Sequence, residues 1–265
     1  GLVGSEMCIR DRMYSPEDEE TELNMARVFF EKEINAIIWF PVLPKRHVSV
    51  ASLFGKNKIP VIIGEKVTDH VTSPWVCIRN DYYGGTQSAL EHLLNHGHKR
   101  IAYVGPRGNE ADFGPIPERW NAYKDIMKSN NLWNPDTLVI KPSLFKEWHV
   151  NLNKLEAIFR SSEAPTALIG FDDIIAQEAV RGLKAIGLSI PEDVAVIGHG
   201  DLSCNGYSEP RLSTVSLCNS EYADVLIRIL NKMLDQESSD IFSENGREIV
   251  ISQRLLLRDS TKATD

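Results

Sequence analysis

Apolar residues recur at helical spacing along residues 81–96, and a short, wholly apolar run follows at residues 101–104. The repeating positions are Ala89, Leu90, Leu93 and Leu94. This spacing predicts one amphipathic helix, and Gly97 is typical of the residue that ends a helix in a left-handed conformation. The apolar run has the length of a buried strand. A helix, a tight turn and a buried strand together form one step of an α/β domain.

The same alternation of amphipathic and apolar segments continues along most of the chain. One predicted helix starts at Ser15. Further predicted helices cover residues 48–54, 119–130, 152–159, 174–186 and 222–234. Predicted strands cover residues 34–40, 59–63, 76–78, 138–140, 167–170, 194–197 and 248–257. Strands that alternate with helices at this spacing indicate βαβ units, which build parallel sheets with helices on both faces. The pattern therefore predicts an α/β protein.

Composition narrows the class of protein. The 265 residues are 42% hydrophobic and 25% charged, which is ordinary for a globular chain. No apolar run approaches the roughly 18 residues of a membrane-spanning helix, so we expect no membrane association. The net charge of -8 argues against nucleic-acid binding by this chain itself, because phosphate recognition needs clustered Lys and Arg. Four scattered cysteines without C-x-x-C spacing favour a reducing, cytoplasmic location.

Several segments carry a resemblance to a known family. Besides residues 81–105 they are 119–123 (RWNAY), 165–167 (PTA), 171–176 (FDDIIA), 187–198 (GLSIPEDVAVIG), 208–215 (SEPRLSTV) and 254–260 (RLLLRDS). Each segment alone is weakly specific. In this order, however, they resemble the effector-binding core of the lactose-repressor (LacI/GalR) family of bacterial transcription regulators. The resemblance covers nearly the whole chain from about residue 15 to residue 260.

The resemblance implies two Rossmann-like lobes of the type I periplasmic-binding-protein-like kind, with the first lobe incomplete. It places residues 13–104 and 217–243 in the first lobe, residues 105–216 and 244–260 in the second, and residues 261–265 in a tail. Residues 1–12 (GLVGSEMCIRDR) lack both helical periodicity and the apolar core of a signal peptide, so we expect a non-native segment there. We also expect the chain to lack the family's helix-turn-helix and the first strands of its core, which leaves a sheet edge exposed.

For function, the resemblance implies a core that binds a small-molecule effector, a sugar or a related metabolite. Operator DNA is then contacted only through the absent N-terminal domain, and the intact parent is a homodimer. The alternative is the solute-binding subunit of a sugar ABC transporter, which shares this fold; an upstream export signal would favour it. No G-x-S-x-G elbow and no dinucleotide-binding glycine pattern occurs, so we expect neither an enzyme nor a cofactor.

Two residues are the principal candidates for effector binding. Arg119 matches the family arginine that holds a pair of sugar hydroxyls, and a planar guanidinium suits that geometry. Its alternative role is a surface ion pair. Asp172 stands where the family often has a ligand-contacting Asn, and a carboxylate would accept a hydroxyl hydrogen bond. Its alternative role is a helix N-cap, and both roles can hold at once.

Further candidates follow from a departure from the family pattern. The family typically has Asp at the position of Gly200, with that Asp on the ligand, whereas here Asp201 comes one residue later. Asp201 reaches the pocket if the neighbouring glycines let the turn shift; otherwise the acceptor role passes to His199 or is lost. Phe145 or Trp148 is the candidate stacking platform for a sugar ring, with coverage of a helix base as the alternative.

Three histidines lie close together in the sequence. His92 and His96 have the i, i+4 spacing that can hold a metal on one helix face, and His98 follows. No carboxylate or cysteine completes a ligand set nearby, and the resemblance already accounts for two of the three histidines. We therefore predict no metal site.

Overall fold

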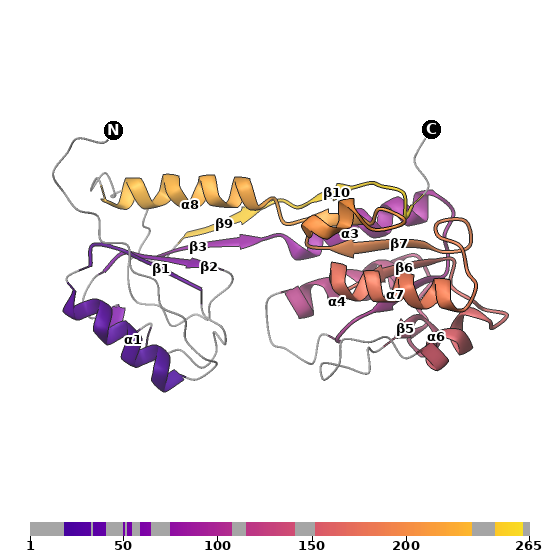
Figure 1. The fold of residues 1–265 in the computed structure, drawn as a ribbon. Coiled ribbons are helices and arrows are strands. Elements are labelled where there is room, and N and C mark those ends of the chain that lie inside the picture. Colours follow the sequence, from indigo (N-terminus) through magenta and orange to yellow (C-terminus); the bar gives the residue numbers. More distant parts are fainter. Residues whose placement is uncertain are drawn as a thin grey trace. The chain divides into compact units, whose positions relative to one another are not determined.

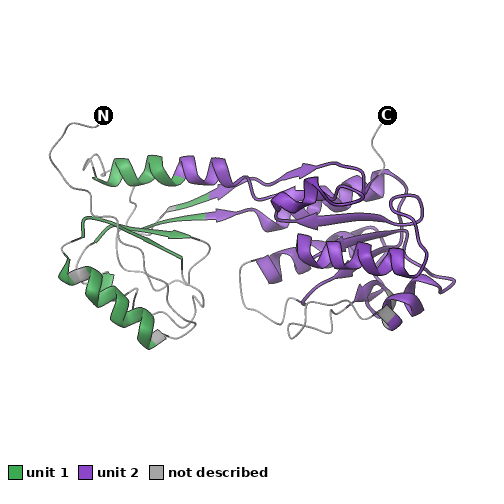
Figure 2. Cartoon of the chain, viewed as in Figure 1, with its two compact units in different colours: residues 1–78, 226–249 green, residues 79–225, 250–265 purple. Residues whose placement is uncertain are grey.

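The computed structural model describes residues 19–32, 34–40, 50, 52–54, 59–64, 75–107, 115–140, 152–234 and 247–261. The chain forms two compact units (Figure 2). Unit 1 comprises residues 1–78 and 226–249, and unit 2 comprises residues 79–225 and 250–265. No helix in the described ranges is long and apolar enough to cross a membrane.

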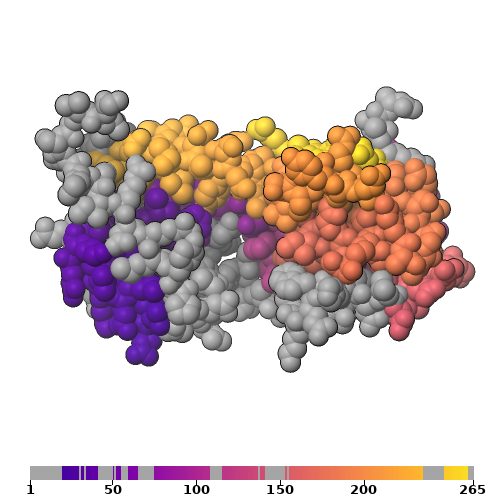
Figure 3. Space-filling model, in the orientation of Figure 1, coloured from indigo at the N-terminus to yellow at the C-terminus, as the bar shows by residue number. Residues whose placement is uncertain are grey.

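Unit 1 is built on a four-stranded sheet with the strand order β1-β2-β3-β9. These strands are β1 (Ile37–Trp39), β2 (Val61–Gly64), β3 (Trp75–Asn80) and β9 (Arg247–Ile251). The first three pair in parallel, as the alternating sequence pattern predicts. Trp39 packs edge to face against Phe54 at 5.7 Å, and its indole nitrogen donates to Glu22 on helix α1 (Glu19–Glu31). Helix α1, in indigo, lies on the surface in Figure 3.

Unit 2 contains a six-stranded sheet in the order β10-β8-β7-β6-β4-β5. Figure 1 labels its strands β10, β7, β6 and β5. Its strands are β4 (Ile101–Val104), β5 (Val139–Ile140), β6 (Ala167–Gly170), β7 (Ala195–His199), β8 (Ser213–Ser216) and β10 (Arg254–Leu256). All neighbours pair in parallel except β8 and β10, which are antiparallel. The central strands are buried along their whole length, so they read as continuous apolar runs in the sequence.

Helices cover both faces of this sheet. They are α3 (Tyr82–Asn95), α4 (Pro115–Ser129), α6 (Leu152–Phe159) and α7 (Asp173–Ala185), with the single turn α5 (Pro135–Leu138) before β5. Successive strand residues alternate between two apolar clusters. Ile101 and Tyr103 pack with residues of α3 and α4, whereas Ala102 and Val104 pack with residues of α6 and α7. This period-two alternation is what places helices on both sides.

The predicted lobe boundaries differ from those of the structure. The resemblance places residues 81–104 in the first lobe, but β4 lies between β6 and β5 in the sheet of unit 2, and α3 packs on that sheet. The chain therefore changes unit after residues 78, 225 and 249 rather than near residues 104, 216 and 243. The cause is that a helix-turn-strand step has the same sequence pattern in either lobe.

Most predicted elements are confirmed, several with the predicted ends. Strands 101–104 and 167–170 and helix 152–159 have the predicted bounds. The predicted closing strand 248–257 is instead two strands, β9 and β10, which belong to different sheets. Helix α8 (Asn219–Leu234) begins three residues earlier than predicted. Residues 1–12 and 262–265 lie outside the described residues.

Candidate functional site

The predicted site residues that the structure describes belong to unit 2, around the carboxyl ends of β6 and β7. Open α/β sheets bind ligands at this edge, where the strands give way to helices. Arg119 comes from α4 and is only 5% exposed. Ala122, Tyr123 and Met127 lie on the same buried face of α4, three, four and eight positions further on. Helical periodicity therefore turns Arg119 toward the sheet rather than toward solvent.

The guanidinium of Arg119 is held by a carbonyl group and two aromatic rings. Its Nη1 donates to the carbonyl oxygen of Phe171 at 2.6 Å. The centre of the guanidinium lies 5.0 Å from the ring of Tyr82 and 4.9 Å from the ring of Phe171. These are cation–π contacts, which partly replace the lost hydration. The Nε atom is buried and has no acceptor among the described residues.

Arg119 is therefore not the surface ion-pair residue of the alternative interpretation. No carboxylate of the described residues forms an ion pair with it. Burial lowers the pKa of Arg119 from its ordinary value, while Tyr82, Tyr103, Asp172 and Asp173 act in the opposite direction. A buried cation with unused donors is an arrangement that suits a ligand rich in acceptors.

Asp172 caps helix α7. Its Oδ1 accepts from the backbone nitrogen of Ile175 at 2.7 Å, so the N-cap role is confirmed. Burial raises the pKa of Asp172, and the hydrogen bonds of the helix end and the charge of Arg119 act against that rise. Contact with an effector is compatible with this position, because only one carboxylate oxygen is needed for the cap.

Asp173 is a structural residue that the sequence analysis missed. Its carboxylate is fully buried, accepts from the hydroxyl of Thr214 at 2.6 Å and accepts from the backbone nitrogen of Leu202 at 2.8 Å. A Cβ atom at Gly198 would lie 2.3 Å from Asp173 Oδ1, so the glycine leaves room for the carboxylate. No local sequence signal reveals this role, since the partners are 41 and 29 positions away.

His199 is buried and uses both ring nitrogens within the chain. Nδ1 lies 2.9 Å from the carbonyl oxygen of Gly170, and Nε2 lies 3.1 Å from the hydroxyl of Thr86. A carbonyl oxygen only accepts, so Nδ1 carries the proton. Burial, together with the charge of Arg119, lowers the pKa of His199 to about 3, so the ring is neutral.

Asp201 points to an arginine of the same unit. Its Oδ1 accepts from Nη2 of Arg258 at 2.6 Å, and its backbone nitrogen donates to the hydroxyl of Thr214. Both Gly200 and Asp201 have positive φ angles, 125° and 53°, so the turn after β7 does depart from an extended course. In this arrangement the carboxylate has a partner without any ligand. Phe145 and Trp148, the candidate stacking residues, lie outside the described residues.

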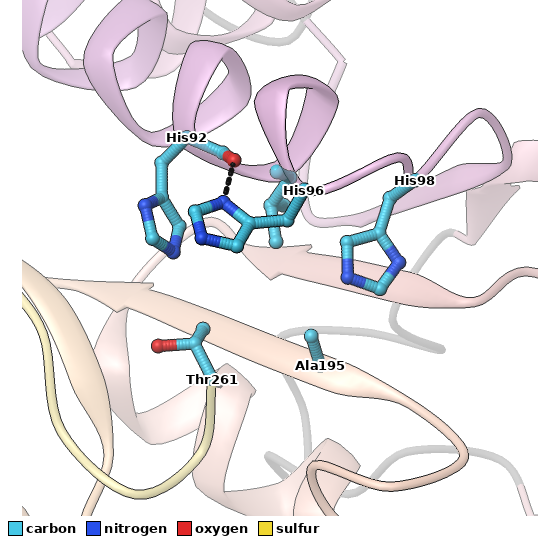
Figure 4. A pocket seen from close by; sticks show the side chains of 6 residues that line it. His92, His96, His98, Ala195 and Thr261 are labelled. Carbon is cyan, nitrogen blue, oxygen red and sulfur yellow. Dashed lines mark hydrogen bonds between the residues drawn. The ribbon is translucent and has the colours of Figure 1, made fainter. Parts of the chain in front are cut away.

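The three neighbouring histidines line a small pocket of about 110 Å³ (Figure 4). Leu93, Ala195 and Thr261 complete its lining. The rings of His92 and His96 lie with centroids 4.2 Å apart, and Nδ1 of His96 donates to the carbonyl oxygen of His92 at 2.7 Å. His98 instead contacts the hydroxyl of Thr166. Among the residues with described positions, no group of three or more His, Cys, Asp or Glu side chains is arranged to hold a metal ion.

A family profile decides the classification of this fold and site. The profile described as "Periplasmic binding protein-like domain" matches residues 90–261, which is most of unit 2 together with α8 and the closing strands. The chain belongs to this family. The match runs through Arg119, Asp172 and His199, so the site described above lies inside the domain that defines the family.

Curated relatives connect this domain to transcription regulators. Catabolite control protein A of Priestia megaterium is 23% identical over 253 residues, which are 94% of this chain and 71% of that protein. The HTH-type transcriptional repressor PurR of Aliivibrio fischeri (strain MJ11) is 25% identical over 244 residues, which are 91% of this chain and 70% of that protein. The relatives are regulators rather than enzymes, as the resemblance to the LacI/GalR family implied.

Solved structures share the fold. A regulatory protein of the LacI family from Chloroflexus aggregans superposes with a TM-score of 0.77 at 19% identity, over 94% of this chain and 84% of that chain. A sugar-binding LacI-family regulator from Escherichia coli, complexed with phosphate, gives a TM-score of 0.74 at 22% identity, over 93% of this chain and 84% of that chain. The predicted two-lobed, periplasmic-binding-protein-like α/β fold is thus confirmed, and the transporter alternative is not favoured.

Proposed function

We propose that this chain is the effector-binding core of a LacI/GalR-type transcription regulator and that its effector is a sugar or a related metabolite. The observation that carries the proposal is Arg119, a buried guanidinium with unused donors at the ligand-binding edge of the unit 2 sheet. The relatives place this kind of domain in regulators, and the E. coli neighbour is described as sugar-binding.

Arg119 and Asp172 are the proposed contacts to the effector. The planar guanidinium can donate to two adjacent oxygens at once, and Asp172 can accept from a hydroxyl. His199 has partners within the chain on both ring nitrogens, and Asp201 has one on a carboxylate oxygen. We therefore assign these two residues a supporting role and not the principal contacts to the effector. An aromatic platform from Phe145 or Trp148 remains part of the proposal.

In the intact regulator, a helix-turn-helix contacts operator DNA and two copies of the protein form a homodimer in the cytoplasm. An effector that binds one conformation of the core more tightly than another shifts the population between them, and that shift changes DNA affinity. The net charge of -8 supports the view that the core itself does not contact DNA.

The test is a binding measurement on the full chain and on a conservative variant. A thermal-shift screen with glucose, ribose, gluconate and sugar phosphates identifies a binding compound, and calorimetric titration gives its Kd. We expect Arg119→Lys to weaken binding by roughly ten- to a hundredfold, because lysine cannot reproduce the planar fork and charge-assisted hydrogen bonds contribute about 1.5–3 kcal/mol.

Arg211→Lys is the matched control. Arg211 forms an exposed ion pair with Asp259, with contacts of 2.7 and 2.8 Å, and lies outside the proposed site. This variant should bind the effector as the parent chain does. The proposal fails if no compound of the screen binds, and the role of Arg119 fails if both lysine variants bind equally well.

A further inference from the structure

Asp172 and Asp173 are the carboxylates whose charges act on Arg119, and each has a partner other than Arg119. Asp172 accepts from the backbone of Ile175, and Asp173 accepts from Thr214 and Leu202. Asp201 pairs with Arg258. The guanidinium of Arg119 is hydrogen-bonded only to a carbonyl oxygen among the described residues. In this part of the chain, Arg119 is therefore a buried cation without an ion-pair partner.

A buried charge without a partner is costly, and proteins usually pair such charges or use them to bind ligands. The rings of Tyr82 and Phe171 offset only part of this cost, because cation–π contacts contribute about 0.5–2 kcal/mol. The compensating negative charge can arrive with the effector. An anionic group at Arg119 would form charge-assisted hydrogen bonds with donors that are now unused.

By contrast, Asp173 and His199, two groups close enough to act on Arg119 electrostatically, are already engaged within the chain. A neutral sugar presents hydroxyl groups that donate as well as accept, so its binding site needs several free acceptors. Asp173 has a partner on each carboxylate oxygen, and Nε2 of His199 faces Thr86. Asp172 keeps acceptor capacity beyond its cap, which is enough to hold one hydroxyl group beside the anion. The backbone amides at the start of α7 partly offset the negative charge of Asp172 and so weaken its repulsion of the anion.

We infer that the effector is an anionic sugar, with a phosphate or carboxylate group that pairs with Arg119 and a hydroxyl group that donates to Asp172. This inference rests on the proposed function and narrows its ligand class. Phosphate and carboxylate both present two neighbouring oxygen atoms that can accept two hydrogen bonds from one guanidinium group.

The test compares matched sugars with and without charge. Calorimetric titration of the full chain uses glucose, glucose 6-phosphate and gluconate, then ribose and ribose 5-phosphate, with inorganic phosphate alone as a further probe. We expect at least one anionic sugar to bind ten times or more tightly than its neutral counterpart. Its affinity should also fall with added salt more steeply than that of the neutral sugar.

Variants assign the preference to one residue. Arg119→Gln should remove the advantage of the anionic sugar over the neutral one, whereas Arg211→Gln should leave it unchanged. Tight binding of neutral sugars with no gain from the anionic group overturns the inference but upholds the proposed function. Inorganic phosphate that binds as tightly as the sugar phosphate overturns the sugar assignment. If neither charged nor neutral sugars bind, the proposed function itself is wrong.

Discussion

Arg119 and His199 donate to consecutive carbonyl groups at the end of strand β6. Nη1 of Arg119 lies 2.6 Å from the oxygen of Phe171, and Nδ1 of His199 lies 2.9 Å from the oxygen of Gly170. The first donor comes from α4 and the second from β7, so two elements from different parts of the chain hold the point where β6 gives way to α7. One donor is charged and the other neutral, and this difference leads to opposite predictions for their replacement.

Replacement of Arg119 by methionine should change stability little. The variant loses the hydrogen bond to Phe171, but it also removes a buried charge that no carboxylate of the described residues pairs with. These effects oppose each other, so we expect the free energy of unfolding to change by less than about 1 kcal/mol. Chemical denaturation of the ligand-free parent chain and of the variant measures this change in the free energy of unfolding. Met127→Ala on the same helix face, fully buried, should cost about 2–5 kcal/mol.

The sequence predicted the local elements better than their partners. Strands 101–104 and 167–170 were predicted with the ends that the structure shows, because an uninterrupted apolar run has a clear beginning and end. Which sheet a strand joins depends on pairing between distant residues, and that is why β4 was assigned to the wrong lobe. Helical spacing alone could have shown that Arg119 shares a face with Tyr123 and Met127.

The candidate site was predictable only in part, for a similar reason. The N-cap role of Asp172 is local and was foreseen. The role of Asp173 depends on Thr214 and Leu202, which no short sequence window contains together with it. The direction of the Asp201 carboxylate depends on a positive φ angle and on Arg258, 57 positions away. Such contacts arise from the tertiary fold and have no local pattern.

Alanine at Gly198 should destabilise the protein through Asp173. A Cβ atom there would lie 2.3 Å from Asp173 Oδ1 and 3.0 Å from the side chain of Leu212. The carboxylate cannot move away without losing its hydrogen bond from Thr214 or from Leu202. We expect a loss of about 1–3 kcal/mol in the free energy of unfolding. Gly206→Ala is the control, because no atom lies within 4 Å of the added methyl group; its effect should stay within about 0.5 kcal/mol. Equal effects of the two changes would contradict the steric explanation.

Neutralisation of Asp201 should affect stability more than effector affinity. Its carboxylate is partly exposed and paired with Arg258, so Asp201→Asn removes an ion pair that contributes up to about 1 kcal/mol. Arg258→Met should cost more, because Nη1 of Arg258 also donates to the carbonyl oxygen of Leu212 at 2.8 Å. The double variant should cost less than the sum of the two single changes. Calorimetric titration of the same variants decides the ligand role. If Asp201→Asn lowers affinity tenfold at unchanged stability, Asp201 contacts the effector as the sequence suggested.

His199 should make the protein less stable in acid. Burial lowers its pKa to about 3 in the folded state, whereas an exposed histidine in the unfolded chain has a pKa of about 6.5. The unfolded state therefore binds more protons between these two values, so stability is fully present above pH 6.5 and declines as the pH falls toward 3. At pH 5 the loss from this residue alone amounts to about 2 kcal/mol relative to neutral pH.

Denaturation curves measured from pH 7.5 to pH 5 test this effect. His199→Gln lacks the titrating group, so its unfolding free energy should fall by about 2 kcal/mol less over that range, although the variant starts from a lower stability at pH 7.5. His92 also has a lowered pKa, mainly through partial burial, and the charges of His96 and His98 act in the same direction. His92→Gln is thus the appropriate comparison, with a smaller change expected because its ring is only partly buried. An unchanged slope in His199→Gln would show that the imidazole is not buried in its neutral form, and the assigned proton on Nδ1 would then be wrong.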